Sequence, residues 1–83
     1  MGKRVDWTAQ AKTDLRAINQ ATALRILHSL ARYAAQGEGD VKRLYNVDPP
    51  ELRLRVGDYR VRFHDFGHSM VVLAVKHRRE AYR

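Results

Sequence analysis

Residues 52–63 read LRLRVGDYRVRF, and apolar side chains alternate with arginines on both sides of a Gly57-Asp58 break. Strict alternation around a two-residue break that contains glycine predicts a β-hairpin. Because the glycine comes first, a type II′ turn is favoured over a type I′ turn. This turn fixes which residues face each other on the apolar side: Val56 and Tyr59, Leu54 and Val61, and Leu52 and Phe63.

Four arginines share the opposite side of the hairpin. The same register sets Arg55 opposite Arg60, and Arg53 opposite Arg62. Like charges directly across a β-ladder destabilise it, by roughly a few tenths of a kcal/mol per pair. Folding alone therefore gives no reason for this cluster, whereas a bound polyanion would supply one.

The composition is that of one small domain covering residues 1–83, with 45% hydrophobic and 30% charged residues. The chain contains no cysteine, which excludes disulfides and thiolate metal sites. No apolar run approaches the roughly 18 residues of a membrane span, and the N-terminal residues lack a signal-peptide core. We therefore expect a cytoplasmic protein without a membrane partner.

The formal net charge is +7, and 12 of the 16 basic residues are arginines. The planar guanidinium suits bidentate phosphate recognition and stacking on bases, whereas lysine is a strongly hydrated point charge. The positive net charge favours nucleic acid, an anionic membrane surface or an acidic protein as the partner.

The residues before the hairpin predict a strand and two helices. A strand over residues 4–7 precedes a helix over Ala9–Ile18, with Thr8 as the N-cap. A second helix covers Gln20–Gln36, and Asn19 is its N-cap. The expected buried stripe of this helix consists of Ala23, Leu27, Leu30, Ala31 and Ala34, widened by Leu24, Ile26 and Tyr33.

The remaining segments complete the predicted fold. Residues 41–47 are ambiguous, with an extended conformation as one alternative, and Asp48-Pro49-Pro50 breaks any regular element. Residues 65–68 form a turn, and Met70–Lys76 is nearly continuous in apolar residues, as in a strand covered on both faces. The order β-α-α-β-β-β predicts an α+β domain, with two helices packed on a small, curved, mostly antiparallel four-stranded sheet.

Further basic residues flank the central arginines. Lys42-Arg43 is either a phosphate contact or part of a plain surface loop. The basic tail surrounds Tyr82 with arginines, an arrangement that favours base stacking, although a tail of this kind also aids solubility. The additional candidates for nucleic-acid contact are Lys42, Arg43, Arg62, His64, His77 and Arg79.

No standard enzyme motif and no metal-spaced set of histidines and carboxylates is present. His64 and His77 are the side chains near the basic patch whose ordinary pKa suits proton transfer near neutrality. The residues themselves therefore predict an anion-binding sheet face, most plainly for RNA or DNA.

The element order and two long strings resemble the RelE/ParE superfamily of type II toxins. The strings are PPELRLRVGDYRVRF at residues 49–63 and VVLAVKHRREAYR at residues 71–83. The resemblance covers essentially the whole chain, and it is most specific from Leu52 to Tyr82. It implies one of two activities: RelE-like members are ribonucleases that cut mRNA, typically in the ribosomal A site, whereas ParE-like members poison DNA gyrase.

The RelE-like branch matches the candidate site better. By matching position, Arg53 and Arg55 take the place of its paired basic residues, and Arg60 that of the arginine in its G-x-Y-R turn. Arg78 and Tyr82 match its tail arginine and tyrosine. The resemblance thus implies a metal-free, cofactor-free endoribonuclease with these five residues as the catalytic set.

The resemblance also implies a mechanism and partners. The 2′-hydroxyl of the RNA attacks the adjacent phosphate, and arginines stabilise the transition state. The best-studied RelE-like sites carry lysines where this chain has Arg53 and Arg55, and arginine is effectively always protonated. The proton acceptor is therefore open among Tyr82, His64 and His77. The implied partners are mRNA, the ribosome and an acidic antitoxin; a non-catalytic RNA-binding module is a further alternative.

Overall fold

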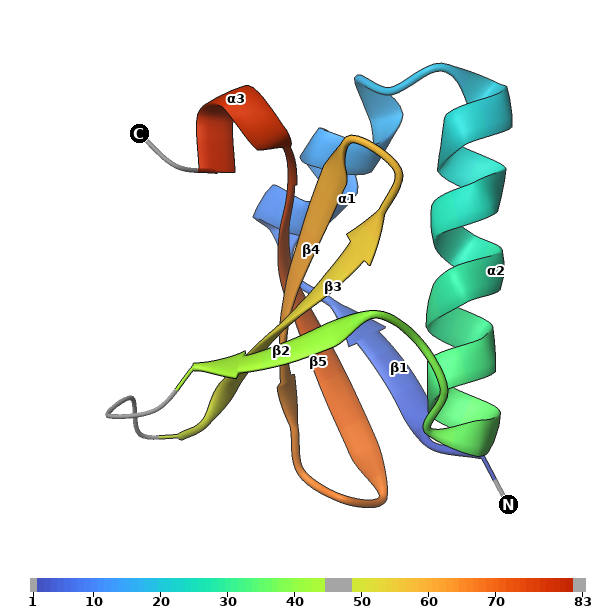
Figure 1. Ribbon diagram of the computed structural model, residues 1–83, viewed down its shortest axis with the longest axis vertical. Helices are drawn as coiled ribbons and strands as arrows, with labels where there is room; N and C mark the ends of the chain where they lie inside the picture. The colour runs from blue at the N-terminus through green and yellow to red at the C-terminus, as the bar shows by residue number, and fades with distance from the viewer. Residues whose placement is uncertain (1, 45–48, 82–83) are drawn as a thin grey trace.

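The computed structural model describes residues 2–44 and 49–81, and these contain five strands and three helices. The strands form one sheet in the order β1-β5-β4-β3-β2, in which β1 runs parallel to β5 and the other neighbours are antiparallel. In Figure 1, α2 lies along one side of this twisted sheet, and α3 stands at the turn of the β3–β4 hairpin. The elements are β1 (Arg4–Trp7), α1 (Ala9–Arg16), α2 (Gln20–Gln36), β2 (Val41–Leu44), β3 (Glu51–Val56), β4 (Tyr59–Asp65), β5 (Ser69–His77) and α3 (Arg78–Ala81).

The α+β class and the mostly antiparallel sheet are confirmed, but the predicted count of four strands is wrong. β2 adds a fifth strand at the sheet edge. It pairs with β3, with Val41 opposite Leu54 at one end and Leu44 opposite Glu51 at the other. Its four residues are too few to show a period of two, and the central pair is charged, so sequence pattern left the segment ambiguous. The tail also forms the short helix α3, which no pattern indicated.

The β3–β4 hairpin has the predicted register at every pair. Leu54 faces Val61 in the core, and Arg55 faces Arg60 on the other side of the sheet. Gly57 opens the turn with a φ of 58°, the left-handed value that both primed turn types require at this position. The arginine cluster is therefore a consequence of this turn.

Replacing Gly57 with alanine should destabilise the fold by about 1–2 kcal/mol, because an L side chain is strained at this left-handed φ. The added Cβ would meet only the Arg25 guanidinium, at an ordinary 3.6 Å, so the expected cost is conformational. Urea unfolding measures the change. Gly2→Ala is the matched control, since Gly2 has no left-handed φ and its Cβ has ordinary contacts. Equal stability of the two variants would contradict this prediction.

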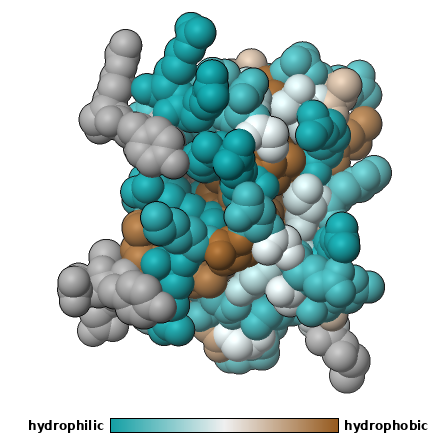
Figure 2. All heavy atoms as spheres, viewed as in Figure 1, coloured by the Kyte–Doolittle hydropathy of each residue, from teal (hydrophilic) through white to brown (hydrophobic). Residues whose placement is uncertain are grey.

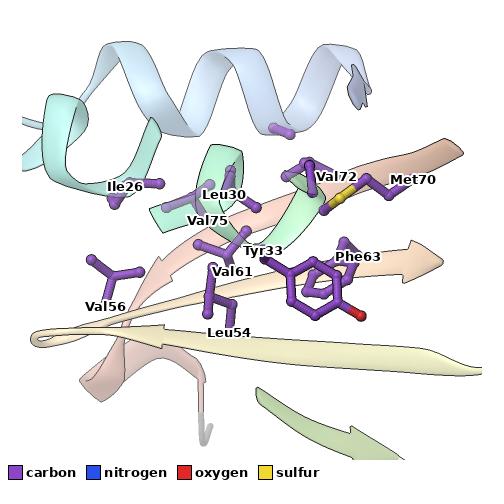
Figure 3. Packing of buried hydrophobic residues seen from close by; sticks show 12 residues of the cluster. Ile26, Leu30, Tyr33, Leu54, Val56, Val61, Phe63, Met70, Val72 and Val75 are labelled. Atoms are coloured by element: carbon purple, nitrogen blue, oxygen red, sulfur yellow. The ribbon is translucent and has the colours of Figure 1, made fainter. Parts of the chain in front are cut away.

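The core lies between α2 and the inner side of the sheet. Figure 3 shows Ile26, Leu30 and Tyr33 pointing from the helix toward the strands. The Tyr33 ring meets the Phe63 ring edge-on, with centroids 5.1 Å apart. The other buried hydrophobic residues of this cluster are Ala11, Ala34, Leu54, Val56, Val61, Met70, Val72 and Val75.

The buried stripe of α2 differs from the predicted one. Leu24 and Leu27 are 48% and 38% exposed, and Ala31 is exposed as well. The other predicted residues Ile26, Leu30, Tyr33 and Ala34 are buried. The Tyr33 ring packs on Phe63, and its hydroxyl donates a 2.8 Å hydrogen bond to Asp65. Counting apolar residues could not reveal this buried polar contact.

α1 covers the edge of β5 beyond the end of β1. The Thr8 hydroxyl donates to the Leu73 carbonyl at 3.1 Å, and the Val75 N–H donates to the Asp14 carboxylate at 3.0 Å. Lys76 Nζ lies 3.1 Å from the same carboxylate. Burial alone would raise the pKa of Asp14. The hydrogen bonds that its carboxylate accepts from Val75, Gln10 and Lys76 outweigh burial, and the pKa is lowered.

Asp65 ties α2 and the N-terminal segment to the end of β4. Its carboxylate accepts hydrogen bonds from Tyr33 Oη at 2.8 Å and from Lys3 Nζ and the Gly67 N–H, both at 2.9 Å. Burial opposes ionisation, but the hydrogen bonds prevail and lower the pKa of Asp65. Burial and this carboxylate together raise the pKa of Tyr33 to about 12.

Candidate nucleic-acid interface

The side of the sheet opposite α2 carries two rows of basic residues, which we call the arginine face. Residues paired across neighbouring strands point to the same side of a sheet. Pairing places Arg55, Arg60 and Lys76 in the row nearest the hairpin turn. The next row contains Lys42, Arg53 and Arg62.

An open cavity of about 220 Å³ lies on this face. Arg53 Nε is buried there and has no hydrogen-bond partner among the described residues. A buried donor without an acceptor is costly, so an oxygen of a bound ligand would stabilise it. The lining residues are Asp40, Lys42, Leu44, Arg53, Arg55 and Arg60.

Arg60 and Arg78 are both held at the hairpin turn. Arg60 Nη1 donates to the carbonyls of Gly57 and Tyr59, at 3.3 and 3.2 Å. The Arg78 N–H donates to the Asp58 carbonyl at 2.7 Å, and its Nε lies 3.8 Å from the Asp58 carboxylate. The start of α3 is therefore tied to the turn beside the arginine face. Tyr82, the remaining predicted catalytic residue, lies outside the described residues.

Arg62 shares this face but already has an anionic partner. Its Nε and Nη2 form a bidentate pair with Glu51, at 3.0 and 2.8 Å. Glu51 is only 7% exposed. The hydrogen bonds from Arg62 outweigh burial, and the charges of Arg62, Arg53 and His64 assist them in lowering the pKa of Glu51. Lys76 is likewise paired with Asp14, so the positive charge around the cavity comes from its lining residues Lys42, Arg53, Arg55 and Arg60.

Acid should destabilise this fold through Asp14, Glu51 and Asp65. A carboxyl whose pKa is lower in the folded chain than in the unfolded chain stabilises the fold above the unfolded pKa. That contribution disappears as the pH falls through the folded pKa. All three groups have lowered pKa values. We expect the free energy of unfolding to change little from pH 7 to 5 and to drop below about pH 4. Urea titrations across this range test it, and equal stability at pH 5 and pH 3 would refute it.

The other predicted contacts lie apart from the cavity. His64 is on the arginine face, in the row of Glu51, but about 13 Å along the strand from Arg60. Its Nδ1 lies 3.1 Å from the Pro50 carbonyl. His77 pairs with Tyr59 on the opposite side of the sheet, where their rings meet edge-on at 5.3 Å.

Lys42 and Arg43 point to opposite sides of the sheet. Lys42 pairs with Arg53 and lines the cavity, whereas Arg43 pairs with Leu52 on the core side. The charge of Arg43 acts on Tyr33 there. Arg79 is exposed on α3. Only some residues of the Lys42-Arg43 pair and of the basic tail therefore lie on the arginine face.

Asp40 and Glu51 are the residues that sequence reasoning missed. Glu51 begins β3 in alternation with Arg53 and Arg55, so its place on the face could have been read from the hairpin pattern. Asp40 reaches the cavity only because β2 pairs with β3, and that pairing had no clear signal.

The described residues contain neither a candidate metal site nor a helix that could span a membrane. No three His, Cys, Asp or Glu side chains in residues 2–44 and 49–81 are grouped so that they could hold a metal ion. None of the helices in these ranges is long and apolar enough to cross a bilayer. Figure 2 shows that hydrophilic residues predominate on the visible side of the molecule, with apolar residues gathered near its centre.

Solved structures of toxin–antitoxin complexes share this fold. The RelE–RelB complex from Pyrococcus horikoshii OT3 contains a chain that is 25% identical, with a TM-score of 0.77 over 94% of this chain and 97% of that one. A chain of the RelB–RelE complex from Methanococcus jannaschii is 20% identical, with a TM-score of 0.76 over 93% and 94%. A chain of the RelBE2 complex from Mycobacterium tuberculosis is 21% identical, with a TM-score of 0.77 over 93% and 99%. The fold is therefore that of RelE/ParE superfamily toxins.

A family model gives the closer assignment. Residues 5–82 match the model described as the ParE toxin of the type II toxin-antitoxin system, parDE. This match spans nearly the whole chain, so the protein belongs to that family and is a toxin of a type II toxin–antitoxin system. No curated protein matches the sequence.

Proposed function

We propose that this toxin is a ribosome-dependent endoribonuclease that cleaves mRNA and so inhibits translation. The observation that carries the proposal is the cavity on the arginine face, where Lys42, Arg53, Arg55 and Arg60 converge. Three arginines around one open cavity suit a phosphate, because guanidinium groups bind phosphate oxygens through charge-assisted, often bidentate hydrogen bonds. The buried Nε of Arg53 adds a donor that a phosphate oxygen could satisfy.

The proposed reaction needs only the RNA and this chain. The ribose 2′-oxygen forms a bond to the adjacent phosphorus, and the bond from phosphorus to the 5′-oxygen breaks. The products are a 2′,3′-cyclic phosphate and a 5′-hydroxyl end. Arg55 and Arg60 stabilise the extra negative charge of the pentacoordinate transition state, a contribution that is usually large when the donors are positioned in advance.

The tail completes the proposed site. Arg78 is tied through Asp58 to the same hairpin turn whose carbonyls hold Arg60. Tyr82 would stack on a base and help to hold the attacking oxygen in line, so that orientation supplies part of the rate. Lys42 and Arg79 would contact neighbouring phosphates, and with Arg62 already paired to Glu51 the RNA would follow the hairpin end of the face.

We also propose a cytoplasmic site of action and an acidic antitoxin as partner. The similar structures are complexes with RelB antitoxins, which favours a partner of the same kind here. A net charge of +7 suits an acidic partner. Leu24 and Leu27 are exposed about one turn apart on α2, and they offer an apolar contact for an amphipathic segment.

Gyrase inhibition is the second candidate function. The observation in its favour is that the matching family model is named for ParE, whose branch of the superfamily poisons DNA gyrase. The names RelE and ParE thus point to different targets for one fold, and the fold by itself does not separate them.

Two assays on the purified chain test the proposal side by side. One follows translation of a defined message, with primer extension to detect cuts; the other follows supercoiling by DNA gyrase. We expect cut message and unaffected supercoiling. Intact message together with inhibited supercoiling would replace the ribonuclease by the gyrase inhibitor. RNA binding without either effect would establish a non-catalytic module.

A further inference from the structure

The proposed cleavage needs a group that accepts the proton of the 2′-hydroxyl, and the basic residues of the cavity do not provide one. Arginine keeps its proton at all ordinary pH values, and Lys42 is a cation without acceptor capacity while protonated. His77 faces the opposite side of the sheet, and His64 lies about 13 Å along β4 from Arg60. Tyr82 lies outside the described residues, so among those that the structure describes the acceptor is sought in the other residues of the cavity.

Asp40 is the acidic residue among those that line the cavity, and alternation with Lys42 sets its side chain on the same side of the sheet. Its position is set by its backbone, because the Asp40 carbonyl accepts the Arg55 N–H at 2.9 Å at the start of the β2–β3 pairing. The side chain is exposed. No ion pair within 4 Å joins it to another described residue, whereas the neighbouring acids Glu38 and Glu51 are paired with arginines.

We propose that Asp40 is the general base of the cleavage reaction. This inference rests on the proposed ribonuclease function. As the bond from the 2′-oxygen to phosphorus forms, the 2′-hydroxyl proton moves to a carboxylate oxygen of Asp40. The bond from phosphorus to the 5′-oxygen breaks, and that oxygen takes a proton from water. Asp40 then returns its proton to water, so the reaction consumes no net proton.

The negative charge of Asp40 should have opposite effects on cleavage and on RNA binding. Lys42 from β2, Arg53 and Arg55 from β3 and Arg60 from β4 line the same cavity. These cations attract the phosphate, while the negative charge of Asp40 repels it. A residue present only to hold RNA would not be an acid. Loss of this charge should therefore slow cleavage and at the same time leave RNA binding unchanged or tighter.

The test compares Asp40→Asn, Asp40→Glu and the wild-type chain in single-turnover cleavage of a message on programmed ribosomes. We expect Asp40→Asn to lower the rate by about 10²–10⁴-fold, the usual contribution of general base catalysis. Asp40→Glu keeps a carboxylate and should recover part of that loss. The dissociation constant for a single-stranded RNA, measured in parallel, should not increase.

Glu38→Gln is the matched control. It makes the same change of charge two residues away, at a side chain that pairs with Arg32 on the surface and does not line the cavity. If the wild-type chain cleaves and Asp40→Asn cleaves equally fast, the inference is wrong and Tyr82 becomes the acceptor to examine. A parallel loss of cleavage and RNA binding in Asp40→Asn would also overturn it. If the wild-type chain itself leaves the message intact, the proposed function fails first.

Discussion

Replacing Arg60 with alanine should lower the rate of mRNA cleavage by about 10²–10³-fold, the usual cost of removing one donor from a preorganised anion site. Arg60 lines the cavity of the arginine face, and carbonyls of the hairpin turn accept hydrogen bonds from its guanidinium. Its position is therefore fixed before RNA binds. Primer extension on a translated message measures the rate.

Two further variants show whether the effect belongs to the site. Arg60→Lys keeps the charge but loses the planar fork, so it should restore only part of the activity. Arg4→Ala makes the same change of charge on β1, where the exposed Arg4 pairs with Asp6, and it should cleave like the wild type. Wild-type cleavage by Arg60→Ala would remove Arg60 from the catalytic set.

Replacing Phe63 with alanine should destabilise the fold by about 3–5 kcal/mol, because it removes a large side chain from a site that cannot refill. Phe63 is fully buried, and its ring contacts Tyr33 of α2. A small domain has a total stability of only about 5–15 kcal/mol, so this one change consumes much of it. Thermal unfolding followed by circular dichroism measures the shift in Tm.

Phe66→Ala is the matched control for Phe63→Ala. It removes the same side chain from a position that is 49% exposed, in the turn after β4. Its unfolding temperature should stay close to that of the wild type. Similar losses at the two positions would mean that the core is not organised around the contact between α2 and β4.

The hairpin shows why part of this fold can be predicted from the sequence. Alternation and a leading glycine determine the pairing of residues 52–63, and both are local properties. The placement of Arg53, Arg55, Arg60 and Arg62 on one side of the sheet follows from them without any knowledge of the rest of the fold. The N-caps Thr8 and Asn19 are equally local, and both accept hydrogen bonds from backbone N–H groups at their helix starts.

Other features depend on partners that are distant in sequence. The rotation of α2 follows from the contacts of Tyr33 with Phe63 and Asp65, which lie about 30 residues away. Asp40 enters the cavity through the pairing of β2 with β3. The direction of His77 is a different case, because the local alternation of consecutive strand residues turns it away from the arginines and could have been applied to the sequence. The local sequence pattern around Tyr33 and Asp40 does not show these contacts.

The most direct measurement of the central claim is the chemistry of the RNA ends produced on a translated message. The purified toxin is added to two samples of one message, one being translated and one without ribosomes. We predict cuts within codons in the translated sample only, with 2′,3′-cyclic phosphate and 5′-hydroxyl ends, and about 10²–10³-fold slower cleavage with Arg60→Ala. Uncut message in the translated sample, or ends with a 5′-phosphate, would contradict it.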